Sequence, residues 1–328
     1  MKRCIRQRKS NIAVVASLAA CLAAASSQPA TAADRVVLQL SWLPQGQASA
    51  LFYGIERNCF ADQQIDLTVQ RGYGNSDTVN KIVAKTAQFG QLDLGSVIVA
   101  REKFQAPIKS VMPLFSDSAL AIAVLESSPI KSMKDLEGRT IAAGPGEGGV
   151  LLVPIAIRNE GGDMGKVSLR TIEPSALAGS LLQKSVDGIL TYVTTAAAID
   201  TVAKKAGLSV RTLGYGKNLG IYGDTFIADE SLIQANPGLV DRFRKAINCA
   251  YRGAQKEPEA AVRIMVSKFP EMDFNRELML AKMGWSLVFG SDTPALEWDQ
   301  AKLKKTSEVT TASQSLSKVA DPESFTYR

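Results

Sequence analysis

Residues 65–83 read IDLTVQRGYGNSDTVNKIV and predict a strand, a glycine turn and the start of a helix. Apolar and polar residues alternate over residues 65–70, as they do in a strand with one buried face. The apolar residues after the turn have the spacing of one helix face: Val79, Ile82 and Val83. The segment is therefore typical of one strand–helix unit of an α/β protein.

The turn within this segment carries residues that suit a ligand contact. Gly72 and Gly74 let the backbone bend and approach a bound molecule closely. Asn75, Ser76 and Asp77 can cap the helix, so that its first N–H groups point outward. A small polar ligand would meet backbone donors and three polar side chains here; the alternative is a well-capped turn without a ligand.

The same alternation of strands and helices runs along the chain from residue 35. Strands are expected at 36–40, 65–70, 92–94, 108–114, 119–125, 140–143, 167–171, 188–191, 209–212 and 225–228. Helices are expected between them and up to residue 307, with the last residues loosely held. Repeated strand–helix units predict mostly parallel sheets that are covered by helices on both faces.

The pattern restarts after residue 116 and becomes helical after residue 222, which predicts two lobes. We expect residues 35–117 and 223–328 to form lobe 1 and residues 118–222 to form lobe 2. The two crossings between the lobes would act as a hinge. Because ligands of open α/β sheets bind outside the carboxyl ends of the strands, the facing lobes would enclose one ligand cleft.

The N-terminus predicts export. Five cations in the first nine residues precede an apolar run over 12–25, and Ala30-x-Ala32 follows. This layout is typical of a signal peptide over residues 1–32, and the run is short for a membrane span. The alternative is lipidation of Cys21, in the lipobox-like run Leu18–Cys21. Without those five cations the 328-residue chain has 33 basic and 32 acidic residues, which gives no case for nucleic-acid binding.

Cysteine and histidine usage limits the chemistry of the chain. Outside the signal the cysteines are Cys59 and Cys249, which could form a disulfide in an oxidising compartment. Their apolar helical surroundings favour two buried thiols instead. The chain has no histidine, which excludes Ser-His and Cys-His catalysis, histidine metal sites and histidine proton relays.

Aromatic and polar residues follow the predicted strands, at the edge where the cleft is expected. Trp42 follows the first strand and could stack on a flat ring or pack half-buried. Ser96 opens a helix as a cap, with ligand contact as a second role. Tyr192 follows strand 188–191. Tyr222 and Asp224 lie in the second crossing, where they would close over a ligand or satisfy the hinge backbone.

A second glycine turn, Gly144–Gly149, follows strand 140–143 and contains Glu147. It is not a Walker loop, because no Gly-Lys-Ser/Thr follows it, and its match to GxGxxG lacks a clear downstream acid. The next helix would start late, with Pro154 in its first turn.

The charges of the candidate residues favour a ligand that carries N–H donors. The acids near the turns are Asp77, Glu147, Asp187 and Asp224, whereas the one cation is Arg71. An anionic ligand would need Arg71 and the helix N-termini to outweigh these carboxylates.

Several segments resemble one protein family. They are LQLSWLP at 38–44, the turn at 72–78, SMKDLEGRT at 132–140, SVDG at 185–188 and LGIYG at 219–223. Over about residues 35–290 the chain resembles the periplasmic substrate-binding proteins of ABC importers, in the group that takes thiamine pyrimidine, riboflavin, sulfonates or nitrate. The Trp-Leu-Pro and Tyr-Gly motifs point to the thiamine-pyrimidine (THI5-like) branch.

The resemblance implies a type II periplasmic binding protein: two lobes, each a mostly parallel sheet flanked by helices, with the ligand cleft between them. It implies a monomeric receptor, without catalysis or cofactor, that delivers a small molecule to a membrane permease and its ATPase. The residues expected to bind ligand are Trp42, Gly74, Asn75, Ser76, Asp77, Ser96, Glu147, Tyr192, Tyr222 and Asp224. One departure is Gly148-Gly149, where the family usually has Ser or Thr.

Two ligand classes remain open on this reasoning. The first is a flat nitrogen heterocycle, such as a thiamine pyrimidine precursor, stacked on Trp42 and held by carboxylates. The second is a sulfonate, nitrate or aromatic carboxylate held by helix N-termini and Arg71. A fungal branch of the family resembles a pyridoxal-phosphate enzyme that consumes its own histidine; the lack of histidine and the export signal argue against that activity here.

Overall fold

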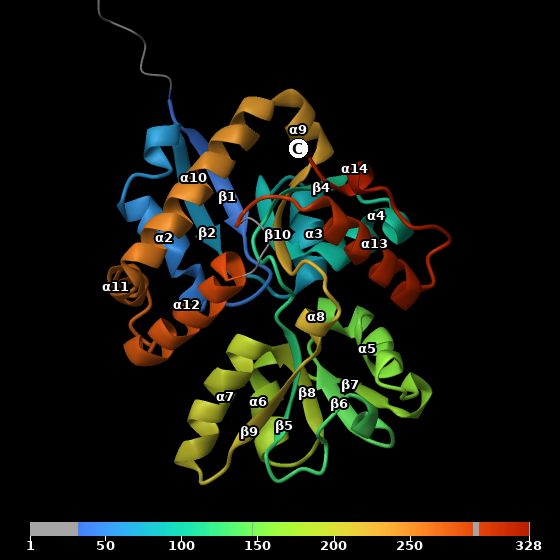
Figure 1. Cartoon of the computed structure of the whole chain (residues 1–328). Coiled ribbons are helices and arrows are strands. Elements are labelled where there is room, and N and C mark those ends of the chain that lie inside the picture. Colours follow the sequence, from blue (N-terminus) through green and yellow to red (C-terminus); the bar gives the residue numbers. More distant parts are fainter. Residues whose placement is uncertain (1–31, 146, 291–294, 328) are drawn as a thin grey trace, which may run out of the picture. The chain divides into compact units, whose positions relative to one another are not determined.

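The computed structural model describes residues 32–145, 147–290 and 295–327. Residues 34–328 form one compact unit that contains two five-stranded sheets (Figure 1). The first sheet has the order β2-β1-β3-β10-β4. Its strands are β1 (Asp34–Gln39), β2 (Ile65–Gln70), β3 (Phe89–Asp93), β4 (Ile108–Pro113) and β10 (Asp224–Asp229). Apart from Ala32, the predicted signal peptide and Cys21 lie outside the described residues.

The second sheet is built from the middle of the chain and has the order β7-β6-β8-β5-β9. Its strands are β5 (Leu120–Leu125), β6 (Thr140–Ala143), β7 (Ser168–Thr171), β8 (Gly188–Tyr192) and β9 (Val210–Gly214). All ten predicted strands are thereby confirmed, although β3 begins three residues before the predicted start.

Each sheet contains one strand that runs against the others. β10 is antiparallel to β3 and β4, and β5 is antiparallel to β8 and β9. These are the two strands that the chain enters directly after crossing from the other sheet. A chain that leaves one sheet at a carboxyl edge enters the next sheet at its own carboxyl edge, so the entering strand must run in reverse. This arrangement agrees with the two-lobed α/β fold expected from the sequence.

Helices flank both sheets. Those associated with the first sheet are α2 (Ser49–Glu56), α3 (Asn75–Val83), α4 (Leu94–Phe104), α9 (Glu230–Ala235), α10 (Pro237–Lys256), α11 (Pro258–Lys268), α12 (Phe274–Phe289), α13 (Gln300–Gln314) and α14 (Pro322–Phe325). Those associated with the second are α5 (Val153–Asn159), α6 (Pro174–Leu182), α7 (Val193–Lys205) and α8 (Tyr215–Asn218). The 3₁₀ turns are η1 (Gly46–Ala48), η2 (Ala61–Gln63), η3 (Lys134–Leu136), η4 (Gly148–Leu151) and η5 (Met164–Lys166). No described helix combines the length and apolarity needed to cross a membrane.

Local sequence explains how several of these helices begin. Asn236 caps α10, because its side chain accepts a hydrogen bond from the Leu239 N–H, and Pro237 occupies the first turn. Pro154 lies in the first turn of α5, as predicted. α10 then buries one apolar face on the first sheet, where the ring of Phe243 stacks on Phe89 with 3.8 Å between the ring centroids.

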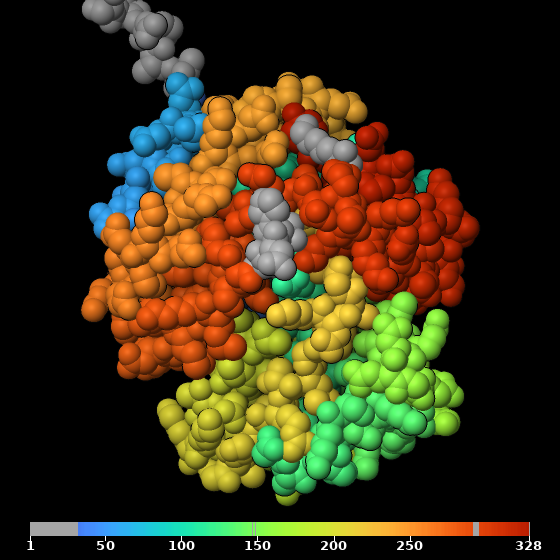
Figure 2. All heavy atoms as spheres, in the orientation of Figure 1, coloured from blue at the N-terminus to red at the C-terminus, as the bar shows by residue number. Residues whose placement is uncertain are grey.

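The C-terminal segment is packed, which corrects the expectation that the last residues are loosely held. Phe325 is buried, and the Tyr327 N–H donates to the Ser110 carbonyl at 2.7 Å. α13 contributes Leu303 to the apolar cluster of the first sheet and Val309 to that of the second. Figure 2 shows the C-terminal helices, coloured orange to red, above the residues of the second sheet in green and yellow.

The two crossings between the sheets hydrogen-bond to each other. Ser118 N donates to Ile221 O at 3.1 Å, and Gly223 N donates to Phe115 O at 3.1 Å. The chain thus passes between the sheets twice at one place, which agrees with the predicted hinge positions. The residue bounds of the two lobes stay a prediction.

Cys59 and Cys249 form a disulfide that joins the turn after α2 to α10, across 190 residues of sequence. The preference for two buried thiols was therefore wrong. Cys59 is buried but Cys249 is exposed, because its position on α10 lies outside the buried face of that helix. Apolar neighbours in sequence did not reveal that the two side chains meet.

Replacing both cysteines, Cys59→Ala with Cys249→Ala, is expected to lower the free energy of unfolding by about 2–4 kcal/mol, because the unfolded chain loses a long-range constraint. Guanidinium unfolding of the oxidised wild type and the double variant measures the difference. Dithiothreitol is expected to lower the stability of the wild type and leave the variant unchanged. Equal unfolding midpoints for wild type and double variant, each with and without dithiothreitol, would contradict a stabilising role of the disulfide.

Candidate ligand-binding site

Two buried acids face each other where the first sheet meets the cleft. Asp93 ends β3 and Asp224 begins β10, and the antiparallel register pairs them directly. Only 4% of Asp93 and 5% of Asp224 is exposed. Like charges opposite one another on neighbouring strands are destabilising, so this pair is costly unless it is protonated or neutralised by a ligand.

Asp93 is held by a small hydrogen-bond network. Its carboxylate caps α4 by accepting from the Ser96 N–H at 2.8 Å, and it also accepts from the Ser96 hydroxyl at 2.9 Å. The Asn75 amide donates to Asp93 and to the Ser96 hydroxyl. Three polar side chains from β3, α3 and α4 are therefore locked together at the edge of the cleft.

This network corrects two predicted caps. The cap of α4 is Asp93, and Ser96 lies inside the helix. The N-cap of α3 is Gly74, at a φ of 111° that favours glycine, and no side chain caps that helix. Asn75 lies inside α3 and turns to Asp93 instead. Asp93 was missed, although an Asp three residues before a Ser, directly after a strand, is a recognisable helix start.

Glu147 supplies the third acid, from the second sheet. It precedes η4, and its carboxyl group accepts a hydrogen bond from the hydroxyl of Tyr192, the last residue of β8. The residue as a whole is half-buried, but its carboxyl group lies deep enough to interact with the charges of Asp93 and Asp224. The acids of both sheets therefore share one polar centre.

Burial dominates the titration of these acids. It raises the pKa of Glu147 to about 8, and the negative charges of Asp93 and Asp224 add to the rise. It raises the pKa of Asp224 to about 7, against a hydrogen bond from the Gln91 amide at 2.8 Å. Burial also raises the pKa of Asp93 in spite of its three donors. Groups perturbed in this way cluster at functional sites.

A small cavity of about 50 Å³ lies beside Trp42, Gln91, Tyr192 and Asp224. Trp42 is half-buried in the loop that follows β1. A Cβ atom on Gly144 would lie 3.4 Å from the Cη2 atom of Trp42, so the indole reaches the glycine turn of the second sheet. An aromatic face, a carboxyl group and a phenol thus border the same space.

The first glycine turn positions this tryptophan. Gly72 N donates to the Trp42 carbonyl at 2.9 Å, and Gly74 N donates to the Ser41 carbonyl at 2.8 Å. A Cβ on Gly72 would lie 2.0 Å from the Leu40 carbonyl oxygen. The prediction that Gly72 gives room to a ligand is therefore wrong; it gives room to the loop that carries Trp42.

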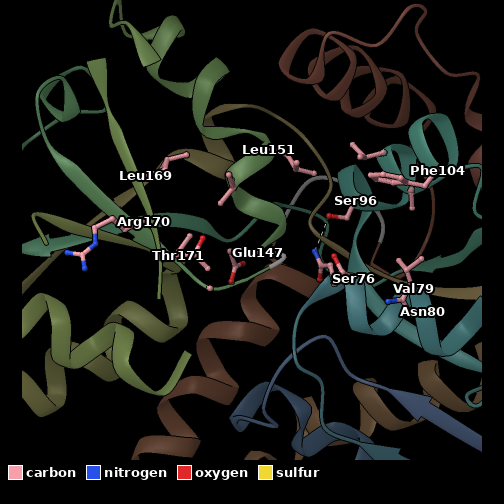
Figure 3. Close-up of a pocket in the computed structure, with 16 residues that line it drawn as sticks. Ser76, Val79, Asn80, Ser96, Phe104, Glu147, Leu151, Leu169, Arg170 and Thr171 are labelled. Atoms are coloured by element: carbon pink, nitrogen blue, oxygen red, sulfur yellow. Dashed lines mark hydrogen bonds between the residues drawn. The ribbon is translucent and has the colours of Figure 1, made fainter. Parts of the chain in front are cut away.

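A larger cavity of about 630 Å³ lies between α3 and α4 on one side and η4 and β7 on the other (Figure 3). Its polar lining includes Asn75, Ser76, Ser96 and Glu147, all predicted as ligand contacts. The volume is within the range of about 300–1,000 Å³ typical of small-molecule sites. Seven of the ten predicted residues thus border one of these two cavities.

The other predicted residues lie elsewhere. Gly74 caps α3 beside the larger cavity, and Asp77 turns along α3 to pair with Lys81 at 3.1 Å. Tyr222 is buried against Trp298, with 5.2 Å between ring centroids, and its hydroxyl donates to the Glu297 carbonyl. The predictions were closure over a ligand or hydrogen bonding to the hinge backbone; the Tyr222 hydroxyl instead bonds to the backbone of Glu297 and Asp299, and the residue lines neither of the two cavities.

The packing around Gly149 explains why glycine stands in the second glycine turn, where the family usually has Ser or Thr. A Cβ on Gly149 would lie 2.7 Å from Leu120, 2.8 Å from Leu190 and 3.0 Å from the Tyr215 hydroxyl. That hydroxyl donates to the Gly149 carbonyl at 3.0 Å. A larger residue at this position would displace the core of the second sheet, so the hydroxyl usual in the family has no room here.

Cations contribute little to the cleft. Arg71 is exposed and lies over the Tyr73 ring, 4.4 Å from its centroid. Among the described residues that line the two cavities, Arg170 is the only cation. Figure 3 shows its side chain directed away from Glu147, and it donates to the Ser185 carbonyl at 3.4 Å. The centre of the site is acidic and aromatic.

The sequence model described as NMT1/THI5 like matches residues 45–261, about two thirds of the chain. The chain belongs to the NMT1/THI5-like family. The match covers most of both sheets and confirms the family resemblance expected from the sequence.

Proteins similar to this NMT1/THI5-like chain include both binding proteins and an enzyme. The riboflavin-binding protein RibY of Chloroflexus aurantiacus is 22% identical, over 79% of this chain and 77% of that protein. The alkanesulfonate-binding protein SsuA of Xanthomonas axonopodis pv. citri, bound to MOPS, superposes with a TM-score of 0.71 at 15% identity, over 91% and 100% of the chains. The desulfurization enzyme DszB gives a TM-score of 0.56 at 16% identity, over 89% and 96%. The two structures share the fold of this chain.

The raised pKa values predict a pH dependence of this chain's stability. In the folded state Glu147 and Asp224 keep their protons to about pH 8 and about pH 7, whereas in the unfolded chain the same groups ionise near pH 4.5 and 3.8. Their contribution to stability is therefore complete below the unfolded pKa values and is lost progressively as the pH rises to 7 and 8. We expect the free energy of unfolding to fall by several kcal/mol between about pH 5 and about pH 9, at up to about 1.4 kcal/mol per pH unit for each acid.

Urea unfolding across this pH range measures the effect. Glu147→Gln, which keeps a neutral side chain at every pH, is expected to show a smaller fall than the wild type. Asp66→Asn, which changes an exposed acid on β2, serves as the matched control and should follow the wild type. Parallel curves for Glu147→Gln and the wild type would contradict the assignment of Glu147.

Proposed function

We propose that this chain is the solute-binding component of an ABC importer, and that it captures a flat nitrogen heterocycle in the cleft between its two sheets. The observation that carries the proposal is the grouping of two buried acids, Asp93 and Asp224, with the half-buried Glu147, near the half-buried indole of Trp42. Membership of the NMT1/THI5-like family and the binding-protein fold support the transport role.

The chemistry of the acids suits a nitrogen heterocycle in either protonation state. A protonated carboxyl group donates a hydrogen bond to a ring nitrogen, and an ionised one accepts from an exocyclic N–H or a protonated ring. The pKa of Glu147, raised to about 8, allows both states near neutral pH. The Trp42 face supplies a stacking surface for the ring. A thiamine-pyrimidine-like molecule fits this description.

The alternative is a sulfonate, nitrate or aromatic carboxylate. The uncapped N-terminus of α3 favours an anion, since its first N–H groups have no side-chain acceptor at the cap. Three carboxyl groups oppose it, and the Arg71 side chain expected to hold the anion lies over Tyr73 instead. We therefore place the anion second.

The proposed receptor works outside the cytoplasm. An export signal over residues 1–32 would deliver it to the periplasm as a monomer, with lipidation at Cys21 as the alternative. The two lobes would close about the paired crossings, with the ligand between them, and the closed form would dock on a permease coupled to its ATPase. No bond in the ligand changes in this cycle.

A thermal-shift panel tests the ligand class. Aminopyrimidines are expected to raise the melting temperature, because ligand at 100 times its dissociation constant stabilises the fold by about 2.7 kcal/mol. Glu147→Gln and Asp224→Asn should weaken binding at least tenfold, about 1.4 kcal/mol. If only sulfonates and carboxylates raise the melting temperature, the ligand is an anion and the proposed nitrogen heterocycle is wrong.

Tryptophan fluorescence locates the ligand. Quenching by a bound aminopyrimidine is expected to disappear in Trp42→Ala and to persist in Trp298→Phe, whose indole lies against Tyr222 away from the acids. Mass spectrometry of the released ligand should return it unchanged. A new product formed at a rate that depends on protein concentration would show an enzyme instead.

A further inference from the structure

The larger cavity changes from polar to apolar along its length. On α4, residues at helical spacing face it in the order Ser96, Val99, Ala100 and Phe104. Ser96 belongs to the acid network, whereas Phe104 is the last residue of the helix and is 75% exposed. One helix face therefore leads from the buried carboxylates to an exposed aromatic ring at the mouth of the cavity.

The opposite wall shows the same change. On β7, Thr171 and Leu169 point to one face because side chains alternate along a strand, and both line the cavity. Arg170 lies between them and also lines the cavity, and its guanidinium donates to the Ser185 carbonyl. Val150 and Leu151 extend this wall from η4. In Figure 3, Leu169 and Phe104 lie on opposite sides of the space, with Glu147 and Ser76 between them.

The exposure of these apolar side chains sets them apart. Leu169 on β7 is 42% exposed and Phe104 on α4 is 75% exposed, and both border one cavity. Other exposed large apolar residues, such as Val202 on α7, do not line that cavity. Exposed apolar surface that converges on a pocket indicates a binding partner that covers it.

We propose that the ligand is amphipathic: a donor-bearing ring lies at Glu147 and an apolar arm extends along Val99 and Leu151 to Phe104 and Leu169. This inference rests on the proposed function, because it assigns the head of the ligand to an acid of that site. Glu147 lines the cavity of about 630 Å³, which has room for both parts. Phe104 and Leu169 then select ligands by the length and apolarity of the arm.

A series of 4-alkylbenzamidines, from the unsubstituted compound to the hexyl derivative, tests the arm. The benzamidine head is flat and carries N–H donors, and the arm grows one methylene at a time. Isothermal titration calorimetry is expected to show affinity rising about two- to fourfold per methylene, as burial of apolar groups predicts.

Variants separate the arm from the head. Phe104→Asp and Leu169→Ser are expected to flatten the rise with arm length and to leave the affinity for benzamidine itself unchanged. Glu147→Gln should lower the affinity of every member by the same factor and preserve the rise. Val202→Asp changes an exposed apolar residue away from the cavity and is the matched control, with the rise of the wild type.

Each outcome bears on one of the two proposals. An affinity that does not depend on arm length, a rise that survives in Phe104→Asp and Leu169→Ser, or a series without binding would overturn the apolar arm. In another outcome, Phe104→Asp and Leu169→Ser abolish the rise with arm length, whereas Glu147→Gln binds every compound as tightly as the wild type does. That outcome would support the apolar arm and contradict the acid-bound head of the proposed function.

Discussion

The pairing of Asp224 on β10 with Asp93 on β3 is the constraint on which the site depends. It exists because β10 runs against its neighbours, which places the first residue of one strand opposite the last residue of the other. The same reversal at β5 sets Leu120 opposite Tyr192, whose hydroxyl binds Glu147. Both reversals follow from the chain crossing between the sheets at their carboxyl edges. The topology thus concentrates acids where two sheets meet.

Such a centre is costly for the folded protein, and its surroundings limit the cost. Asn75 and Ser96 donate to Asp93, Gln91 donates to Asp224, and Tyr192 donates to Glu147. Burial nevertheless raises the pKa of each acid, because no described cation side chain lining the two cavities points to them. Under the proposed function, a ligand with N–H groups would take the place of the protons that these acids hold.

Glycines and the C-terminal helix set the geometry around these acids. Gly72 and Gly74 hold the loop of Trp42 through two backbone hydrogen bonds, and Gly149 lets Tyr215 pack beneath the second turn. α13 places Leu303 and Val309 in the cores of different sheets. The lobe closure that the proposed function requires would have to accommodate this helix as well as the two chain passages.

Hydrophobic periodicity alone determined the ten strands, most of the helices and the two-sheet α/β architecture, because burial of alternating apolar residues is a local property of the chain. Their positions at predicted strand ends, in a glycine turn or in a crossing, together with the family resemblance, pointed to Trp42, Glu147, Tyr192 and Asp224. Contacts between residues far apart in sequence were decided only in three dimensions: the Cys59–Cys249 bond, the hydrogen bond from Asn75 to Asp93, and the burial of Tyr222 beside Trp298. Such contacts depend on strand register, on the rotation of each helix about its axis and on which strand is antiparallel. A short segment of sequence does not determine any of these.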